Sequence, residues 1–153
     1  MKIIYPGSFD PITNGHLDII HKIAKITTWN NPVSVLVMNS DIKTHMFMHE
    51  QRIAMVKKTL KQHMPLFEVE GYDGNINDYI EMQKQDVIIV RGLRNNTDFD
   101  YEMMYETFTR RFDAQTIYIT PSPENIFVSS SLVRNLINTG GEYSDLVPWE
   151  SWL

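Results

Sequence analysis

Short apolar runs rich in β-branched residues alternate with longer amphipathic segments along the chain, and this alternation constrains the fold more than any other feature. The short runs predict strands at residues 3–5, 33–38, 67–71, 87–90 and 116–119. The segments between them carry apolar residues at helical spacing, which predicts helices within 17–24, 53–64, 76–80, 98–112 and 130–137. Such alternation is typical of a parallel sheet with helices on both faces. We therefore expect an α/β protein with a doubly wound, parallel, five-stranded sheet.

Composition limits the class of protein further. With 153 residues, 42% apolar and 22% charged, the chain suits a single globular domain over residues 1–153. The absence of cysteine excludes disulfides, thiolate metal sites and cysteine nucleophiles. No apolar run is long enough to cross a bilayer, and the first residues do not form a signal peptide. We therefore expect a cytoplasmic protein with no membrane partner.

The net charge of −5 argues against a nucleic-acid partner, because proteins that bind nucleic acids usually present a basic face. Small anionic substrates remain open, since a few arginines in a cleft act locally whatever the total charge is. Ligands of doubly wound sheets bind at the carboxyl ends of the strands. The residues that follow each predicted strand are therefore the first place to look for chemistry.

Two glycines and a histidine follow the first predicted strand, in the stretch YPGSFDPITNGHLDII. Gly7 allows a sharp turn and a close approach by a ligand, and Gly15 leaves the first helical turn uncluttered. The helix N-terminus offers free N–H groups and a positive dipole end, and His16 there can donate to phosphate. The alternative is an ordinary helix cap with an incidental histidine. The chain has neither a P-loop nor a dinucleotide-binding glycine motif.

Arg91 and Arg94 come directly after the fourth predicted strand, in IIVRGLRNNTDFDYEMMY. Two guanidinium groups at the end of a strand suit bidentate binding of phosphate. The alternative is a pair of surface arginines that answer the nearby carboxylates of Asp98, Asp100 and Glu102.

Polar residues also open the last predicted helix, in FVSSSLVRNL. Ser129 or Ser130 caps this helix, and the hydroxyl and N–H groups could hold a second phosphate, with Arg134 one turn on. Lys43 lies in the loop after the second predicted strand, where a lone lysine is usually only solvated. His45 and His49 lack a further ligand at metal-binding spacing, so we expect no metal held by the protein.

Together, the three stretches quoted above resemble the motifs of the bacterial phosphopantetheine adenylyltransferases, a family of the nucleotidylyltransferase superfamily. The superfamily's His-x-Gly-His box is matched by Thr13-Asn14-Gly15-His16, and the arginine and serine motifs follow in the family's order. The resemblance covers about residues 2–148 and implies a Rossmann-like fold. It implies transfer of AMP from ATP to 4′-phosphopantetheine, which gives dephospho-CoA and pyrophosphate in coenzyme A biosynthesis.

The resemblance also implies roles for individual residues. ATP would bind to Ser8, Phe9, His16, Gly92, Leu93, Arg94, Glu102, Asn125, Ile126, Phe127, Val128, Ser129, Ser130 and Ser131. Phosphopantetheine would bind to Ser8, Lys43, Ile76 and Arg91. The catalytic groups would be His16, Lys43 and Arg91, with His16 stabilising the transition state. Mg²⁺ would arrive with ATP, CoA is a candidate feedback ligand, and the family is typically a homohexamer.

The reaction needs no strong general base, because the attacking phosphate is already anionic. The lack of a serine–histidine–carboxylate triad is therefore expected. Two other functions stay open: a superfamily enzyme with nicotinamide mononucleotide or glycerol phosphate as acceptor, and a catalytically silent module that binds nucleotide or CoA. The Arg91 to Arg94 block and Lys43 argue against the first, and His16 and the arginines against the second.

Overall fold

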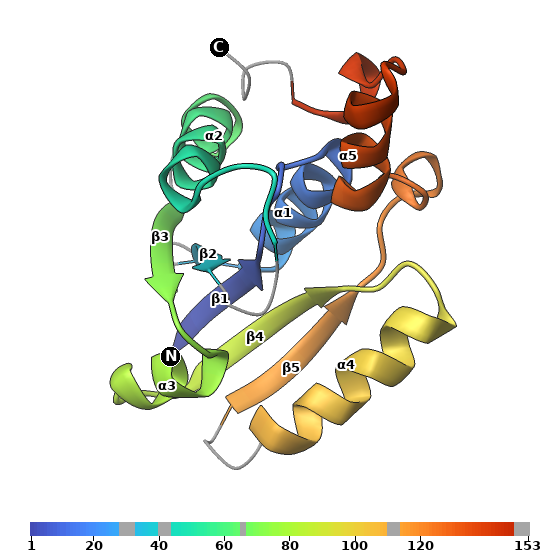
Figure 1. The fold of residues 1–153 in the computed structure, drawn as a ribbon. Helices are drawn as coiled ribbons and strands as arrows, with labels where there is room; N and C mark the ends of the chain where they lie inside the picture. Colours follow the sequence, from blue (N-terminus) through green and yellow to red (C-terminus); the bar gives the residue numbers. More distant parts are fainter. Residues whose placement is uncertain (28–32, 40–43, 65–66, 110–113, 149–153) are drawn as a thin grey trace.

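The computed structural model describes residues 1–27, 33–39, 44–64, 67–109 and 114–148. The described residues form a parallel sheet of five strands in the order β3-β2-β1-β4-β5, which confirms the predicted fold class (Figure 1). The elements in chain order are β1 (Lys2–Gly7), α1 (Asn14–Ile26), β2 (Val33–Asn39), α2 (His49–His63), β3 (Glu68–Asp73), α3 (Ile76–Met82), β4 (Val87–Gly92), α4 (Asn96–Thr109), β5 (Ala114–Ile119) and α5 (Ser130–Thr139). Short 3₁₀ turns lie at Pro123–Asn125 and Ser144–Leu146.

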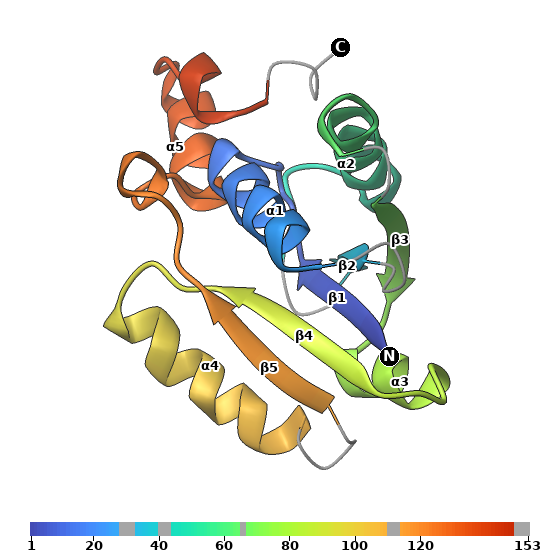
Figure 2. The same ribbon diagram turned by 180° about the vertical axis from the view of Figure 1, so that it is seen from behind.

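Helices cover both faces of the sheet, with α1, α2 and α5 on one face and α3 and α4 on the other (Figures 1 and 2). Successive side chains of each strand point to opposite faces of the sheet, so the core is divided between the same two faces. Tyr5 and Val35 pack toward α1 and α2, together with Ile20 and Val56. The residues at alternate positions pack with Tyr79 and Ile80 of α3, among them Ile4, Leu36 and Ile89. Among the helices of the described residues, none combines the length and hydrophobicity of a membrane span.

The order in which the chain adds strands to the sheet reverses between β1 and β4, and the two strands separate toward their carboxyl ends. β1 pairs with β2 from Ile3 to Gly7, but with β4 only from Lys2 to Ile4. Pro6 therefore lies where β1 has a neighbour on one side only, which is the kind of position that tolerates a missing N–H. Strands that diverge at a switch point leave a crevice at their carboxyl ends.

Candidate active site

A cavity of about 550 Å³ opens at this crevice. Its lining comes from the ends of β1 and β4, from the start of α1, from the segment after β5 and from the start of α5. Twelve of the residues assigned above by resemblance line it: Ser8, Phe9, His16, Arg91, Gly92, Arg94, Glu102, Asn125, Val128, Ser129, Ser130 and Ser131. Residues far apart in the chain thus share one hollow, which is the arrangement that a phosphate-binding role requires.

The other assigned residues lie elsewhere. Leu93, Ile126, Phe127 and Ile76 do not line the cavity. Phe127 is 84% exposed, and Ile76 packs against the core beneath α3. Their ligand contacts stay predictions, as does the role of Lys43, which lies outside the described residues.

His16 is held in one orientation by the cap of α1. Thr13 is the N-cap, and its backbone N–H donates to His16 Nδ1 over 3.0 Å. The Thr13 hydroxyl lies 2.9 Å from the same nitrogen. Because Nδ1 accepts a hydrogen bond from a backbone N–H, the proton of the neutral ring is on Nε2. The cap therefore leaves His16 a donor that can reach a ligand oxygen in the cavity.

The surroundings keep this imidazole neutral. Burial, and after it the positive charge of Arg94, lowers the pKa of His16 to about 4. At neutral pH the ring donates through Nε2–H without carrying a charge. Bound phosphates would add negative charge near the ring and so raise this pKa. His16 is thus suited to donating a hydrogen bond to an anion, and poorly suited to acting as a base.

The loop that joins β1 to His16 is tightly folded. Phe9 is 1% exposed and adopts φ 47°, a region that residues other than glycine seldom occupy. Its ring lies 5.6 Å from that of Tyr5 and 4.9 Å from that of His16, measured between centroids. A Cβ on Gly7 would come within 3.0 Å of this ring. Phe9 therefore packs against the imidazole, a role that sequence reasoning did not separate from ligand binding.

Gly15 brings two helix N-termini together. A Cβ at Gly15 would lie 2.9 Å from the carbonyl oxygen of Val128, which is rigid backbone. The absence of a side chain lets the first turn of α1 pack directly on the segment that leads into α5. Each of these N-termini has unpaired N–H groups and a positive dipole end. Both are directed toward the same cavity, which favours a bound anion.

Both arginines of the arginine motif line the cavity, and both contact carboxylates of α4. Arg91 Nε lies 3.1 Å from Glu102 Oε2, and Arg94 Nε lies 3.1 Å from Asp98 Oδ2. Each arginine therefore both lines the cavity and pairs with a carboxylate, so the two interpretations of the sequence are compatible. An acidic partner that holds a guanidinium in place lowers the entropy cost of binding a ligand.

The serine hydroxyls at α5 all make hydrogen bonds with other described residues, but only that of Ser130 donates. Ser129 caps α5 by accepting from Leu132 N–H at 3.1 Å, and Ser130 donates to the Pro11 carbonyl at 2.8 Å. Ser131 accepts from Arg134 at 3.2 Å. The bond of Ser130 fixes the start of α5 against the β1–α1 loop. The Ser129 and Ser131 hydroxyls accept these bonds and keep their O–H donors, so they can bind phosphate together with the backbone N–H groups.

Sequence reasoning missed two polar residues beside the cavity. Asp10 is 2% exposed and accepts from the N–H groups of Met46 and Phe47, both at 2.9 Å. Arg52, on α2, is 0% exposed and was not singled out from the sequence. No local signal marks either residue, since both depend on contacts between segments far apart in the sequence. Within the described residues there is no cluster of metal-ligating side chains.

Comparison with known proteins identifies the class first. Residues 4–136 match the family described as cytidylyltransferase-like. A solved structure from Vibrio parahaemolyticus, assigned as a nicotinate-nucleotide adenylyltransferase, superimposes with a TM-score of 0.68 and 18% identity. The superposition covers 98% of this chain and 88% of that one, which shows a shared fold. The class is therefore that of the Rossmann-like nucleotidyltransferases.

Sequence relatives narrow the class. A phosphopantetheine adenylyltransferase of Nautilia profundicola is 41% identical over 97% of this chain and 95% of its own length. Those of Campylobacter concisus and Thermodesulfovibrio yellowstonii are 42% and 40% identical over 95% of this chain, and over 91% and 89% of their own. This chain belongs to the phosphopantetheine adenylyltransferase family, within the cytidylyltransferase-like proteins.

Proposed function

We propose that this protein transfers the adenylyl group of ATP to 4′-phosphopantetheine, giving dephospho-CoA and pyrophosphate. Relatives of that name, about 40% identical over nearly the whole chain, support the assignment. The observation that carries it is the shared cavity: His16, Arg91, Arg94 and the N-terminus of α5 line one hollow. Two polyanions can be held there side by side.

The reaction is an in-line displacement. A phosphate oxygen of phosphopantetheine attacks the α-phosphorus of ATP, the bond from that phosphorus to the β-phosphate oxygen breaks, and pyrophosphate leaves. The attacking oxygen is already anionic, so the site must position the reactants and offset growing negative charge rather than remove a proton. No covalent enzyme intermediate is required.

Each group of the cavity has a part in this scheme. His16 Nε2–H donates to the phosphate that develops charge during transfer. Arg91 holds the phosphate of the acceptor, and Arg94 the nucleotide side. The N-termini of α1 and α5 bind the remaining phosphate oxygens through backbone N–H groups. Lys43 would add a cation on the acceptor side.

Mg²⁺ fits this site as the companion of ATP. The described residues provide no cluster of side-chain ligands, so the phosphates themselves would supply most of the coordination. Bound there, the ion would neutralise charge on the pyrophosphate leaving group. The protein's own cations and N–H groups would complete the neutralisation.

A substrate screen tests the assignment. The protein is incubated with ATP and Mg²⁺ and with phosphopantetheine, nicotinamide mononucleotide, nicotinate mononucleotide or glycerol phosphate, and released pyrophosphate is measured. We expect release only with phosphopantetheine. Release only with another acceptor would move the protein to a different nucleotidyltransferase activity, and calorimetric binding of ATP and CoA without any release would indicate a silent module.

We also infer a cytoplasmic homohexamer that CoA can inhibit, as the family resemblance implies. Exposed apolar side chains support the assembly: Phe127 and, on α4, Phe99, Met103 and Met104 are all at least 41% exposed. Sedimentation velocity tests the assembly, and a single species of one chain would contradict it. Inhibition by CoA is tested in the same pyrophosphate assay.

A further inference from the structure

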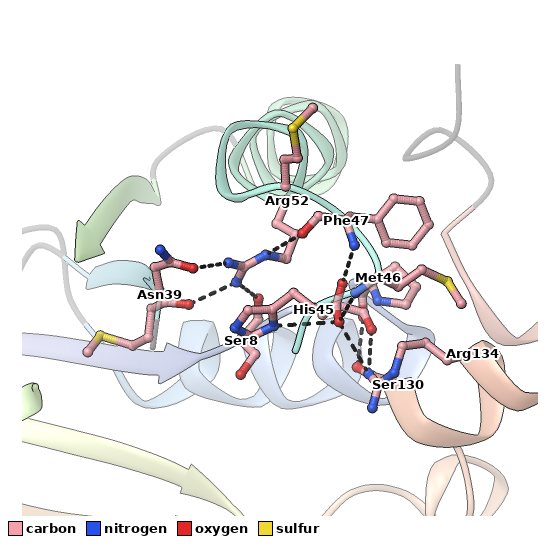
Figure 3. Close-up of polar contacts among 12 residues, drawn as sticks. Ser8, Asn39, His45, Met46, Phe47, Arg52, Ser130 and Arg134 are labelled. Atoms are coloured by element: carbon pink, nitrogen blue, oxygen red, sulfur yellow. Dashed lines mark hydrogen bonds and ion pairs between the residues drawn. The ribbon is translucent and has the colours of Figure 1, made fainter. Parts of the chain in front are cut away.

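A fully buried guanidinium joins the ends of the two central strands beside the cavity. Arg52 Nη1 donates to the Ser8 carbonyl at 2.7 Å, just after β1, and to the Met38 carbonyl at 2.8 Å, in β2. Its Nη2 donates to Asn39 Oδ1 at 2.8 Å, and its Nε to the Phe47 carbonyl at 3.1 Å. Figure 3 shows these bonds spreading from Arg52 to Ser8, Asn39 and Phe47. One side chain thus links three separate segments.

Burying the Arg52 cation costs free energy, and its hydrogen bonds show what the buried guanidinium contributes. Burial lowers the pKa of Arg52, while the charges of Asp10 and Glu50 raise it, and a guanidinium stays protonated in either case. All four of its hydrogen bonds to described residues go to neutral oxygen atoms. Two of these are carbonyls at the ends of parallel strands, which would otherwise direct negative partial charge toward a site for polyanions. Arg52 occupies them and orders the segments that carry them.

Asp10 holds the same segment from the opposite side. Its carboxylate accepts from the N–H groups of Met46 and Phe47, while Arg52 takes the Phe47 carbonyl. Arg134 donates to the Asp10 carbonyl at 2.6 Å, and Ser130 to that of Pro11 (Figure 3). The β1–α1 loop is therefore held between segment 44–48 on one side and α5 on the other.

We propose that Arg52 is a positioning residue for the acceptor: it holds Ser8 in register with segment 44–48 and so shapes the β1–β2 side of the cavity. Ser8, Thr44 and His45 line the cavity on this side, whereas Arg94 and Glu102 line the side of β4 and α4. Arg52 itself does not line the cavity, so it acts through Ser8 and the segment. The proposal rests on the function proposed above, because it assigns the β1–β2 side, together with Arg91 of β4, to phosphopantetheine.

The test separates acceptor binding from nucleotide binding. In Arg52→Lys the charge stays, but an ammonium cannot reach four acceptors in a fork. We expect the KM for phosphopantetheine to rise about tenfold or more, since a displacement of about 1 Å can cost 100-fold in rate. Among the residues assigned to ATP, only Ser8 and Phe9 lie in the β1–α1 loop that Arg52 contacts, so the Kd for ATP, measured by calorimetry, should rise much less than the KM for phosphopantetheine. Arg52→Met should show the same split, more strongly.

Controls keep the outcome interpretable. Lys57→Met removes an exposed cation from the same helix and should match wild type. Asn39→Ala removes only one partly exposed acceptor of the guanidinium, so it should give the same split, less strongly, even if the Arg52 variants fail to fold. A folded Arg52→Lys with wild-type KM, equal weakening of both substrates, or an unchanged Asn39→Ala beside unfolded Arg52 variants would overturn the proposal. Wild-type protein without turnover would refute the proposed function instead.

Discussion

At the scale of single residues, the chemistry depends on how each polar group is oriented by its neighbours. His16 is an N3 residue of α1, and the N-cap Thr13 fixes both its ring and its tautomer. The same bond that caps the helix thereby prepares a donor for the cavity. One side chain therefore has a structural role and the proposed catalytic role, and substitutions have to separate them.

Replacing His16 should remove most of the turnover and leave the fold. Loss of one donor to developing charge costs about 2.7–4 kcal/mol, or about 10²–10³ in kcat. We expect His16→Ala to show this loss, with at most about 2 kcal/mol of lost stability from the cap. His16→Gln keeps an N–H donor and should retain more activity. Steady-state kinetics and urea unfolding measure the two effects, and a near-normal kcat in His16→Ala would remove His16 from the mechanism.

The free energy of unfolding should depend on pH because of the same imidazole. The pKa of His16 is about 4 in the folded protein, below its ordinary value of 6.5, because of burial and of Arg94. Between these pH values the unfolded chain binds more protons, so the free energy of unfolding falls as the pH drops from 6.5 toward 4. Wild type should therefore lose more stability than His16→Gln between pH 7 and pH 5. Parallel losses in urea unfolding would contradict the shift.

Arg91 and Arg94 should differ in the substrate that they bind. Arg91→Ala should raise the KM for phosphopantetheine by about tenfold or more, the value of a charge-assisted hydrogen bond, and the KM for ATP by much less. Arg94→Ala is the matched variant and should weaken ATP more. Both lose a similar salt bridge to α4, so a general effect on the fold would affect them alike. Equal weakening of both substrates by Arg91→Ala would contradict the assignment.

At the scale of elements, the site consists of the ends of strands and the beginnings of helices. β1 and β4 separate after Ile4, and the N-termini of α1 and α5 close the space that they leave. The two helices can meet there only because Gly15 has no side chain. The proposed anion site thus depends on the packing of elements, and not on any one loop.

Gly15→Ala should therefore reduce activity more than stability explains. Its Cβ would lie 2.9 Å from the Val128 carbonyl, so the start of α1 must move away from the segment before α5. Such overpacking costs about 1–3 kcal/mol. Gly140→Ala is the control: at φ 71°, with nothing within 4 Å, it adds backbone strain of about 1–2 kcal/mol far from the cavity. We expect the two variants to have comparable melting temperatures and only Gly15→Ala to lose activity. Full activity in Gly15→Ala would contradict the role of this contact.

At the scale of the whole molecule, an acidic protein provides a cationic hollow. The net charge is −5, yet three arginines, Arg91, Arg94 and Arg134, line the cavity against two carboxylates, those of Asp10 and Glu102. A cleft with low-dielectric walls lets local charges outweigh the total. The total charge therefore disfavours nucleic acids, while the cavity still suits small polyanions.

Chelation of divalent ions should stop the reaction without lowering the melting temperature of the protein. EDTA is expected to abolish pyrophosphate release, because Mg²⁺ would enter with ATP, and to leave the melting temperature of the nucleotide-free protein unchanged. The described residues contain no metal-ligand cluster whose loss would matter. Thermal unfolding with and without EDTA measures this, and a lower melting temperature would indicate a metal held by the protein.

Local patterns predicted the elements well because each strand and helix repeats its apolar residues at its own period. The first and last residues of the elements were harder to predict. Pro6 and Gly7 break a strand pattern, yet both belong to β1, since β2 alone pairs with them. The first turn of α2 is polar, so its start at His49 was not predicted. Phe127 is 84% exposed and outside the cavity lining, so its assigned contact with ATP stays a prediction.

The sequence by itself determined the sheet, its helices and the group of motifs at the strand ends, because periodicity and residue type are local properties. It also placed His16, Arg91 and the serine run among the candidates. Only the tertiary structure decided which of them share a hollow, and that Arg52 is buried rather than solvated. The reason is physical: hydrogen bonds and burial between segments 30 or more residues apart, such as Arg52 and Ser8, leave no trace in the local pattern.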